Sequence, residues 1–171
     1  MNALHMNRRR ARTLGVVLLW GVATACFAGG GLHIGTVVGE PPHGFVRVRV
    51  GGTPYFYHRG FFYQSYGPDF VVVTAPMGAV IGSLPPNHIW ITTPVGPYAY
   101  YYGTFYEWRD RDRRYAVARP PRGARVPSLP RRARSIREEG VEYKEYAGVY
   151  YKRDRDGYEV VAPPRRRAPR R

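Results

Sequence analysis

One aromatic segment recurs three times along this chain, and its central glycines Gly60, Gly103 and Gly148 are 43 and 45 residues apart. The first copy reads Tyr-Phe-Tyr-His-Arg-Gly-Phe-Phe-Tyr. The three copies cover residues 55–63, 98–106 and 143–151. A fixed period of this size indicates repeated supersecondary units. A unit this short cannot bury its own aromatic face, so neighbouring units must share a core.

Local patterns predict strands throughout. Residues 45–50 alternate apolar and charged side chains, as a half-buried strand does, and residues 88–93 are rich in β-branched side chains. Residues 131–139 could form one or two helical turns, but their place in the repeat matches the strand expected at 88–93. We therefore predict an all-β fold of two to three repeated β-hairpin and strand units that share a small aromatic core.

Gly60, Gly103 and Gly148 are predicted to be structural turn residues, because glycine adopts a positive φ without steric strain. None of the three follows Asn or Asp, which type I′ turns favour. We therefore expect either a type I turn that ends in a left-handed glycine or a type II turn.

The N-terminus has the layout of a secretory signal peptide, with a basic cluster, a short apolar run over 14–26 and small residues from Ala28 onward. The basic cluster consists of Arg8, Arg9, Arg10 and Arg12. The apolar run is shorter than the ~20 residues that span a bilayer. The predicted location is the periplasm or the exterior, and translation could start at Met1 or Met6.

The single cysteine, Cys26, lies inside this signal. Cleavage after Ala28 would leave a mature chain without cysteine and hence without disulfides. The alternative is a lipoprotein, since residues 23–26 loosely resemble a lipobox, in which case Cys26 would carry the lipid.

Charge divides the remaining chain. Residues 29–107 carry three basic and three acidic side chains, whereas residues 108–171 carry 20 basic and 9 acidic ones, a net of +11. The last residues combine prolines with arginines and predict a disordered basic tail. The arginines expected to contact an anionic surface are Arg165, Arg166, Arg167, Arg170 and Arg171.

These patterns give a domain plan. We predict a signal peptide over 1–28, a flexible segment over 29–40, a β-repeat domain over 41–164 with units of about 41–84, 85–129 and 130–164, and the basic tail over 165–171.

The aromatic hairpin, a valine strand and the segment Pro-x-Gly-Ala…Ser-Leu-Pro together resemble a group of exported, tyrosine-rich bacterial repeat proteins of unknown function. The resemblance covers roughly residues 41–164. It implies the repeat architecture and brings no activity, cofactor or catalytic residue to this chain.

Candidate sites for chemistry are weak. The serines lie outside any nucleophile motif, and Ser83 and Ser128 belong to the repeated Ser-Leu-Pro. The paired aspartates over 110–112 and 154–156 alternate with arginines and lack the ligands that calcium requires. We expect no enzyme, metal or cofactor.

The predicted function is an exported structural or interaction module of the cell envelope, whose basic half contacts lipid phosphate or lipopolysaccharide; nucleic acid is not an expected partner. The alternative is a module that binds glycans or small ligands through an exposed tyrosine face, for example Tyr100 and Tyr102.

Overall fold

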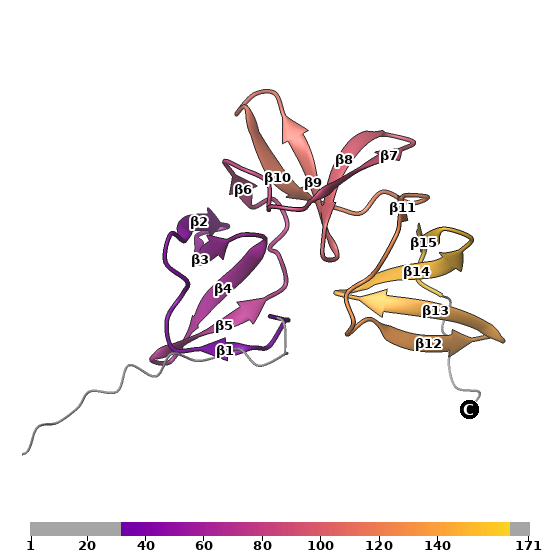
Figure 1. Cartoon of the computed structure of the whole chain (residues 1–171), viewed down its shortest axis with the longest axis horizontal. Helices are drawn as coiled ribbons and strands as arrows, with labels where there is room; N and C mark the ends of the chain where they lie inside the picture. The colour runs from indigo at the N-terminus through magenta and orange to yellow at the C-terminus, as the bar shows by residue number, and fades with distance from the viewer. Residues whose placement is uncertain (1–31, 165–171) are drawn as a thin grey trace, which may run out of the picture. The chain divides into compact units, whose positions relative to one another are not determined.

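The computed structural model describes residues 32–164 of the chain (Figure 1). These residues form 15 strands, arranged as three five-stranded antiparallel sheets, and no helix. The predicted all-β fold is confirmed. Because the described residues hold no helix long and apolar enough to cross a bilayer, none of them is assigned to a transmembrane helix.

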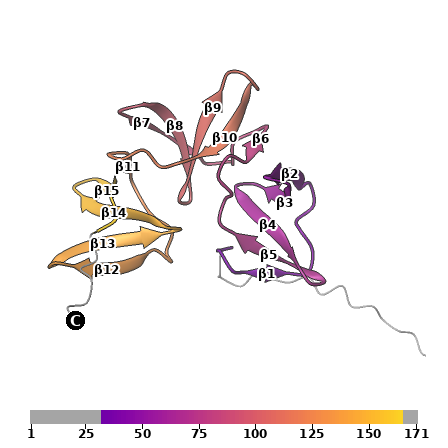
Figure 2. The same ribbon diagram turned by 180° about the vertical axis from the view of Figure 1, so that it is seen from behind.

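All three sheets share one topology: a two-residue strand, then a four-stranded meander whose last strand pairs with the two-residue strand (Figures 1 and 2). Sheet 1 contains β1 (Val37–Val38), β2 (Val46–Val50), β3 (Thr53–His58), β4 (Phe61–Tyr66) and β5 (Asp69–Val73). Sheet 2 contains β6 (Val80–Ile81), β7 (Ile89–Thr93), β8 (Gly96–Tyr101), β9 (Thr104–Arg109) and β10 (Arg114–Ala118). Sheet 3 contains β11 (Arg125–Val126), β12 (Arg134–Glu138), β13 (Val141–Tyr146), β14 (Val149–Asp154) and β15 (Gly157–Val161).

The boundaries between the sheets differ from the boundaries predicted for the repeat units. Val80 and Ile81 fall in the predicted unit 41–84, yet β6 pairs with β10 of sheet 2. In the same way β11 pairs with β15 of sheet 3. Within the segment 29–40, expected to be flexible, Val37 and Val38 form β1 and pair with β5. Each Gly-Ala segment therefore opens a sheet instead of closing one. Residues 131–139, the ambiguous segment, contain the strand β12.

The hairpin turns that join β3 to β4, β8 to β9 and β13 to β14 are each two residues long. Both turn residues have positive φ in every sheet: 46° and 94° at Arg59 and Gly60, 46° and 89° at Tyr102 and Gly103, and 51° and 80° at Ala147 and Gly148. Type I and type II turns lack this pattern, whereas type I′ turns require it. The predicted turn type is wrong, because Arg, Tyr and Ala occupy the left-handed position where Asn or Asp was expected.

Sheets 1 and 2 each bury one face against the sheet that follows. Val48, Tyr57 and Phe62 of sheet 1 share a hydrophobic core with sheet 2. The sheet 2 members of this core are Ala79, Ile81, Ala99, Tyr106 and Val117. The strand registers Ala99↔Tyr106 and Tyr106↔Val117 place these side chains on one face. Sheet 2 thus covers the aromatic face that sheet 1 cannot bury alone.

The opposite face of sheet 2 repeats this contact with sheet 3. Ile91, Tyr100 and Phe105 share a second core with sheet 3. The sheet 3 members of this core are Ala124, Val126, Tyr151 and Val160. Ile136 occupies in sheet 3 the position that Val48 and Ile91 occupy in sheets 1 and 2, on the face directed away from the preceding sheet. Among residues 32–164, no further sheet covers this face of sheet 3.

Candidate functional site

The glycines of the hairpin turns mark the contacts between sheets. A Cβ atom added to Gly60 would lie 2.5 Å from Cδ1 of Tyr101, and one added to Gly103 would lie 2.5 Å from Cδ1 of Tyr146. Tyr101 and Tyr146 are the last residues of β8 and β13. Each of these two turns therefore receives the ring of a tyrosine from the next sheet, and glycine is required for that contact as well as for the positive φ.

The third turn is different, because a Cβ atom on Gly148 would meet nothing within 4 Å. Its amide nitrogen instead donates a hydrogen bond to Oε1 of Glu145, 2.7 Å away. The registers Val46↔Tyr57, Ile89↔Tyr100 and Arg134↔Glu145 show that Glu145 stands where the first two sheets have tyrosine. Sheet 3 therefore has a carboxylate at the position where sheets 1 and 2 have a phenol.

The two tyrosines at this position bind the segment that leads into the next sheet. Tyr57 Oη donates to the carbonyl oxygen of Ser83 at 3.4 Å, and Tyr100 Oη donates to that of Ser128 at 2.8 Å. Residues 32–164 contain no such segment after sheet 3. Glu145, at the equivalent position of sheet 3, contacts Arg134 and the amide of Gly148 instead.

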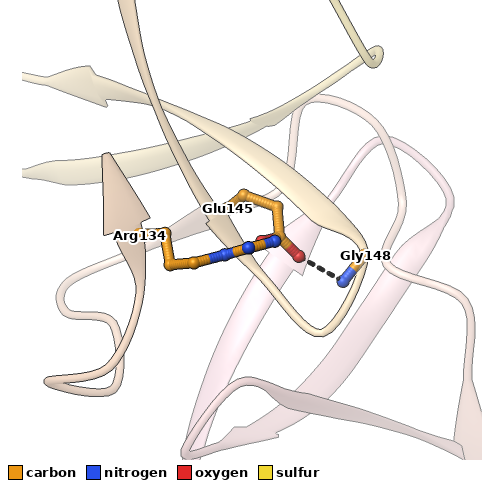
Figure 3. A network of polar contacts seen from close by, with 3 residues as sticks. All are labelled: Arg134, Glu145 and Gly148. Atoms are coloured by element: carbon orange, nitrogen blue, oxygen red, sulfur yellow. Dashed lines mark hydrogen bonds and ion pairs between the residues drawn. The ribbon is translucent and has the colours of Figure 1, made fainter. Parts of the chain in front are cut away.

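Figure 3 shows these partners, Arg134 on one side of the Glu145 carboxylate and the Gly148 amide on the other. Arg134 Nε donates to Glu145 Oε2 at 2.9 Å. Glu145 is only 8% exposed. Burial opposes ionisation of this carboxyl, but the hydrogen bonds from Arg134 and Gly148 outweigh it and lower the pKa of Glu145. Glu145 is ionised at neutral pH and holds the third hairpin turn.

Substitution of Glu145 by glutamine should therefore destabilise the protein in a pH-dependent way. A lowered folded-state pKa contributes stability above the ordinary glutamate pKa of ~4.3, and that contribution is lost as pH falls through the folded-state value. We expect Glu145→Gln to lower the free energy of unfolding by about 1–2 kcal/mol at pH 7. The difference from wild type should shrink as pH falls below about 4. Urea titrations at several pH values measure it, and a pH-independent difference would contradict the role of the charge.

A cavity of about 250 Å³ lies beside this network. Its walls include Thr74 from the end of sheet 1, Tyr102 from sheet 2, and Arg132, Arg134 and Glu145 from sheet 3. A smaller cavity of about 70 Å³ has Tyr102, Tyr146 and Ala147 in common with it and reaches Gly60 and Gly103. Residues of all three hairpin turns therefore line these two neighbouring recesses, and Arg132 and Arg134 line the larger one.

The tyrosines in the cores serve packing. Tyr63, Tyr106 and Tyr151 are fully buried and occupy equivalent positions, opposite Val72, Val117 and Val160. Burial raises the pKa of Tyr57 and of Tyr146 to about 12. Phenols with such pKa values stay protonated at neutral pH. Tyr100, expected to be exposed, is only 4% exposed because its face of β8 packs against sheet 3, whereas Tyr102 is 38% exposed.

Several residues singled out in the sequence lie outside the described part of the chain: Cys26 and the tail arginines Arg165, Arg166, Arg167, Arg170 and Arg171. Within residues 32–164, no three His, Cys, Asp or Glu side chains are placed to hold a metal ion. Sequence reasoning missed the network of Arg134 and Glu145. The signal was available, because aligning the three copies places Glu145 opposite two tyrosines.

Comparison with known proteins gives one match. The model of a family described as a family of unknown function, DUF6515, matches residues 30–114 and, in a second overlapping match, residues 89–167. No curated protein and no solved structure matches the chain.

Proposed function

Because the chain belongs to the DUF6515 family, whose function is unknown, we propose its role from its own residues: an exported structural or interaction module of the cell envelope, not a catalyst, whose basic C-terminal half contacts anionic envelope components. The lipid phosphates and lipopolysaccharide of an envelope are such components. The tyrosine-rich repeats serve as the scaffold that carries the basic surface.

The observation that carries this proposal is a set of exposed arginines without a carboxylate partner among residues 32–164. Arg131, Arg132 and Arg137 belong to sheet 3 and the turn before it, and Arg119 and Arg122 lie in the connection from sheet 2. By contrast, Arg109 and Arg125 are paired with Asp112 and Asp154 at 2.9 and 3.1 Å. Unpaired basic side chains near an anionic membrane surface contribute about 1 kcal/mol each.

The recess beside Arg134 adds a place for a single anionic group. Arg132 and Arg134 both line it, and Glu145 already neutralises part of the Arg134 charge. Arg132 is exposed and has no ion pair within the described residues. A phosphate or carboxylate entering the recess would meet the Arg132 guanidinium, which binds such groups with two parallel hydrogen bonds.

Export is the other half of the proposal, and it rests on the basic cluster at Arg8–Arg12 followed by a short apolar run. Mass spectrometry of the protein purified from its host should find an N-terminus near Gly29. A diacylated Cys26 would instead establish the lipoprotein alternative. An intact N-terminus on cytoplasmic protein would overturn export.

Binding to anionic vesicles should depend on salt and on the arginines of the C-terminal half. We expect deletion of 165–171, or the double substitution Arg131→Gln/Arg132→Gln, to weaken binding to vesicles rich in anionic lipid by roughly tenfold or more at low salt. Co-sedimentation at two salt concentrations measures the effect. The thermal stability of the Arg131→Gln/Arg132→Gln variant should not change, because both side chains are exposed.

Arg47→Gln/Arg49→Gln is the matched control, because it removes the same charge from the net-neutral first half. If the two double variants lose affinity equally, only net charge matters and no basic contact surface exists. Affinity that is independent of salt in every variant would remove the electrostatic proposal altogether.

A further inference from the structure

A row of partly exposed aromatic rings lies on sheet 2. The Tyr115 ring centroid is 6.3 Å from that of Trp90 and 4.9 Å from that of Trp108. The exposed fraction is 56% for Trp90 and 46% for Trp108. His88 packs edge-on against Trp90 at 5.6 Å. We call Trp90, Trp108 and Tyr115 the aromatic ledge.

The ledge continues the face of sheet 2 that packs against sheet 1. Trp90 pairs with Ala99, and Trp108 stands two residues after the buried Tyr106 on the same strand. Side chains two residues apart on a strand share a face. Ala99 and Tyr106 are buried on this face, whereas Trp90 and Trp108 are about half exposed. Tyr115 lies between the two indoles, is partly buried and packs against the core shared with sheet 1.

The other two sheets provide an internal control for these tryptophans. The residues in the register of Trp90 are Arg47 in sheet 1 and Ser135 in sheet 3. The residues in the register of Trp108 are Ser65 and Arg153, opposite Phe70 and Tyr158. The same topology therefore forms with serine or arginine at both positions, and the scaffold does not require the exposed indoles of sheet 2.

The ledge is held in place by a polar rim. Trp108 Nε1 donates to Asp110 Oδ1 at 2.9 Å, which orients the indole. Arg109 and Arg111 pair with Asp112 at 2.9 and 3.2 Å in the same turn. The rim offers both hydrogen-bond donors and acceptors beside exposed ring faces. Asp112 pairs with Arg109 and Arg111, whereas Arg113 and Arg114 of the same hairpin are exposed and have no ion pair among residues 32–164.

We propose that the aromatic ledge binds an oligosaccharide, with sugar rings stacked on the faces of Trp90 and Trp108 and sugar hydroxyls bonded to the rim around Asp110 and Asp112. The C–H groups on one face of a sugar ring meet the negative face of an aromatic ring favourably. Hydroxyl groups donate and accept hydrogen bonds and therefore match a rim of paired carboxylates and guanidinium groups. This site lies on sheet 2 and is separate from the proposed anion-binding surface of sheet 3.

Other occupants fit less well. A stable protein interface takes about 800 Å² and 20–30 residues from each partner, far more than three rings and one turn. At the indole itself a phosphate would meet Asp110, which would repel it. Arg113 and Arg114 of the same hairpin could attract a phosphate, but that binding would weaken with salt, whereas stacking of a neutral sugar would not. Aromatic side chains have few rotatable bonds, so they offer a small ligand a large contact area and lose little conformational entropy on binding.

The test uses the variant Trp90→Ser/Trp108→Arg in the full chain, because sheet 3 carries these residues in the same register. Both proteins are applied to an array of neutral oligosaccharides that includes linear glucose and N-acetylglucosamine hexamers, and hits are titrated by calorimetry. We expect binding to at least one neutral oligosaccharide, with little change between low and high salt. The double variant should keep its melting temperature and lose roughly tenfold or more in affinity, the order expected when a stacking ring is removed.

Three outcomes would overturn the proposal: no neutral oligosaccharide binds, the double variant binds equally well, or the ledge binds a proline-rich peptide such as residues 163–171 and no sugar. Arg131→Gln/Arg132→Gln should leave sugar binding intact. The sugar site and the anionic surface can thus fail independently of each other.

Discussion

Replacement of Gly60 or Gly103 by valine is expected to lower the free energy of unfolding by about 3–5 kcal/mol, while Gly148→Val should lower it by only about 1–3 kcal/mol. All three glycines have positive φ, which strains a β-branched residue. Only at Gly60 and Gly103 does a new Cβ also run into the ring of Tyr101 or Tyr146. The difference between the three variants measures the contact between sheets.

Asparagine separates the two effects, because it tolerates a left-handed backbone but still carries a Cβ atom. Gly148→Asn should be nearly neutral, whereas Gly60→Asn and Gly103→Asn should remain destabilised by the clash. Urea unfolding followed by circular dichroism provides the free energies. Equal losses at all three positions would show that the turns contribute only through their own conformation and that the tyrosine contacts are unimportant.

The sequence was sufficient to predict strands and repeated hairpins, because the glycine spacing and the alternating side chains depend on local geometry alone. It was not sufficient for the turn type, since Arg59, Tyr102 and Ala147 adopt a backbone conformation that their side chains disfavour. The rings packed against Gly60 and Gly103 come from the next sheet, and no local pattern encodes that contact.

Pairing beyond the hairpins was equally hard to predict. The two-residue strand Val80–Ile81 follows sheet 1 closely in sequence but completes sheet 2, and two residues are too few for a recognisable period. Alternation places Tyr100 on one face of β8, but it does not reveal that sheet 3 covers this face. The predicted exposed tyrosine therefore lies in the core.

The candidate sites became visible only through differences between equivalent positions. Glu145 differs from Tyr57 and Tyr100, and the difference marks the network with Arg134 and Gly148. Trp90 and Trp108 differ from the arginines and serines of the other sheets, and the difference marks an exposed surface that folding does not require. In a repeat protein, residues common to all repeats form the scaffold, whereas a residue that occurs in one repeat only indicates a role specific to that repeat.

Tyr151→Ala should lower the free energy of unfolding by about 3–5 kcal/mol, as the loss of a large buried ring does. Tyr151 is fully buried in the core formed by sheets 2 and 3, where it packs with Ile91, Tyr100 and Phe105. Its hydroxyl has no hydrogen-bond partner among residues 32–164. Tyr151→Phe keeps the ring and removes only that hydroxyl, so its effect should be neutral or stabilising by up to about 1 kcal/mol.

The stability at alkaline pH provides a second comparison between wild type and Tyr151→Phe. Burial raises the pKa of Tyr151 above its ordinary value, so the folded protein holds the phenol proton more tightly than the unfolded chain does. Wild type therefore keeps its full stability below the ordinary tyrosine pKa of ~10 and loses stability as pH rises above it. Tyr151→Phe should lose less over that range, as measured by urea unfolding between pH 8 and about 11. A phenylalanine variant that is several kcal/mol less stable than wild type at pH 7 would mean that the hydroxyl has a partner, and the packing role would then not account for this tyrosine.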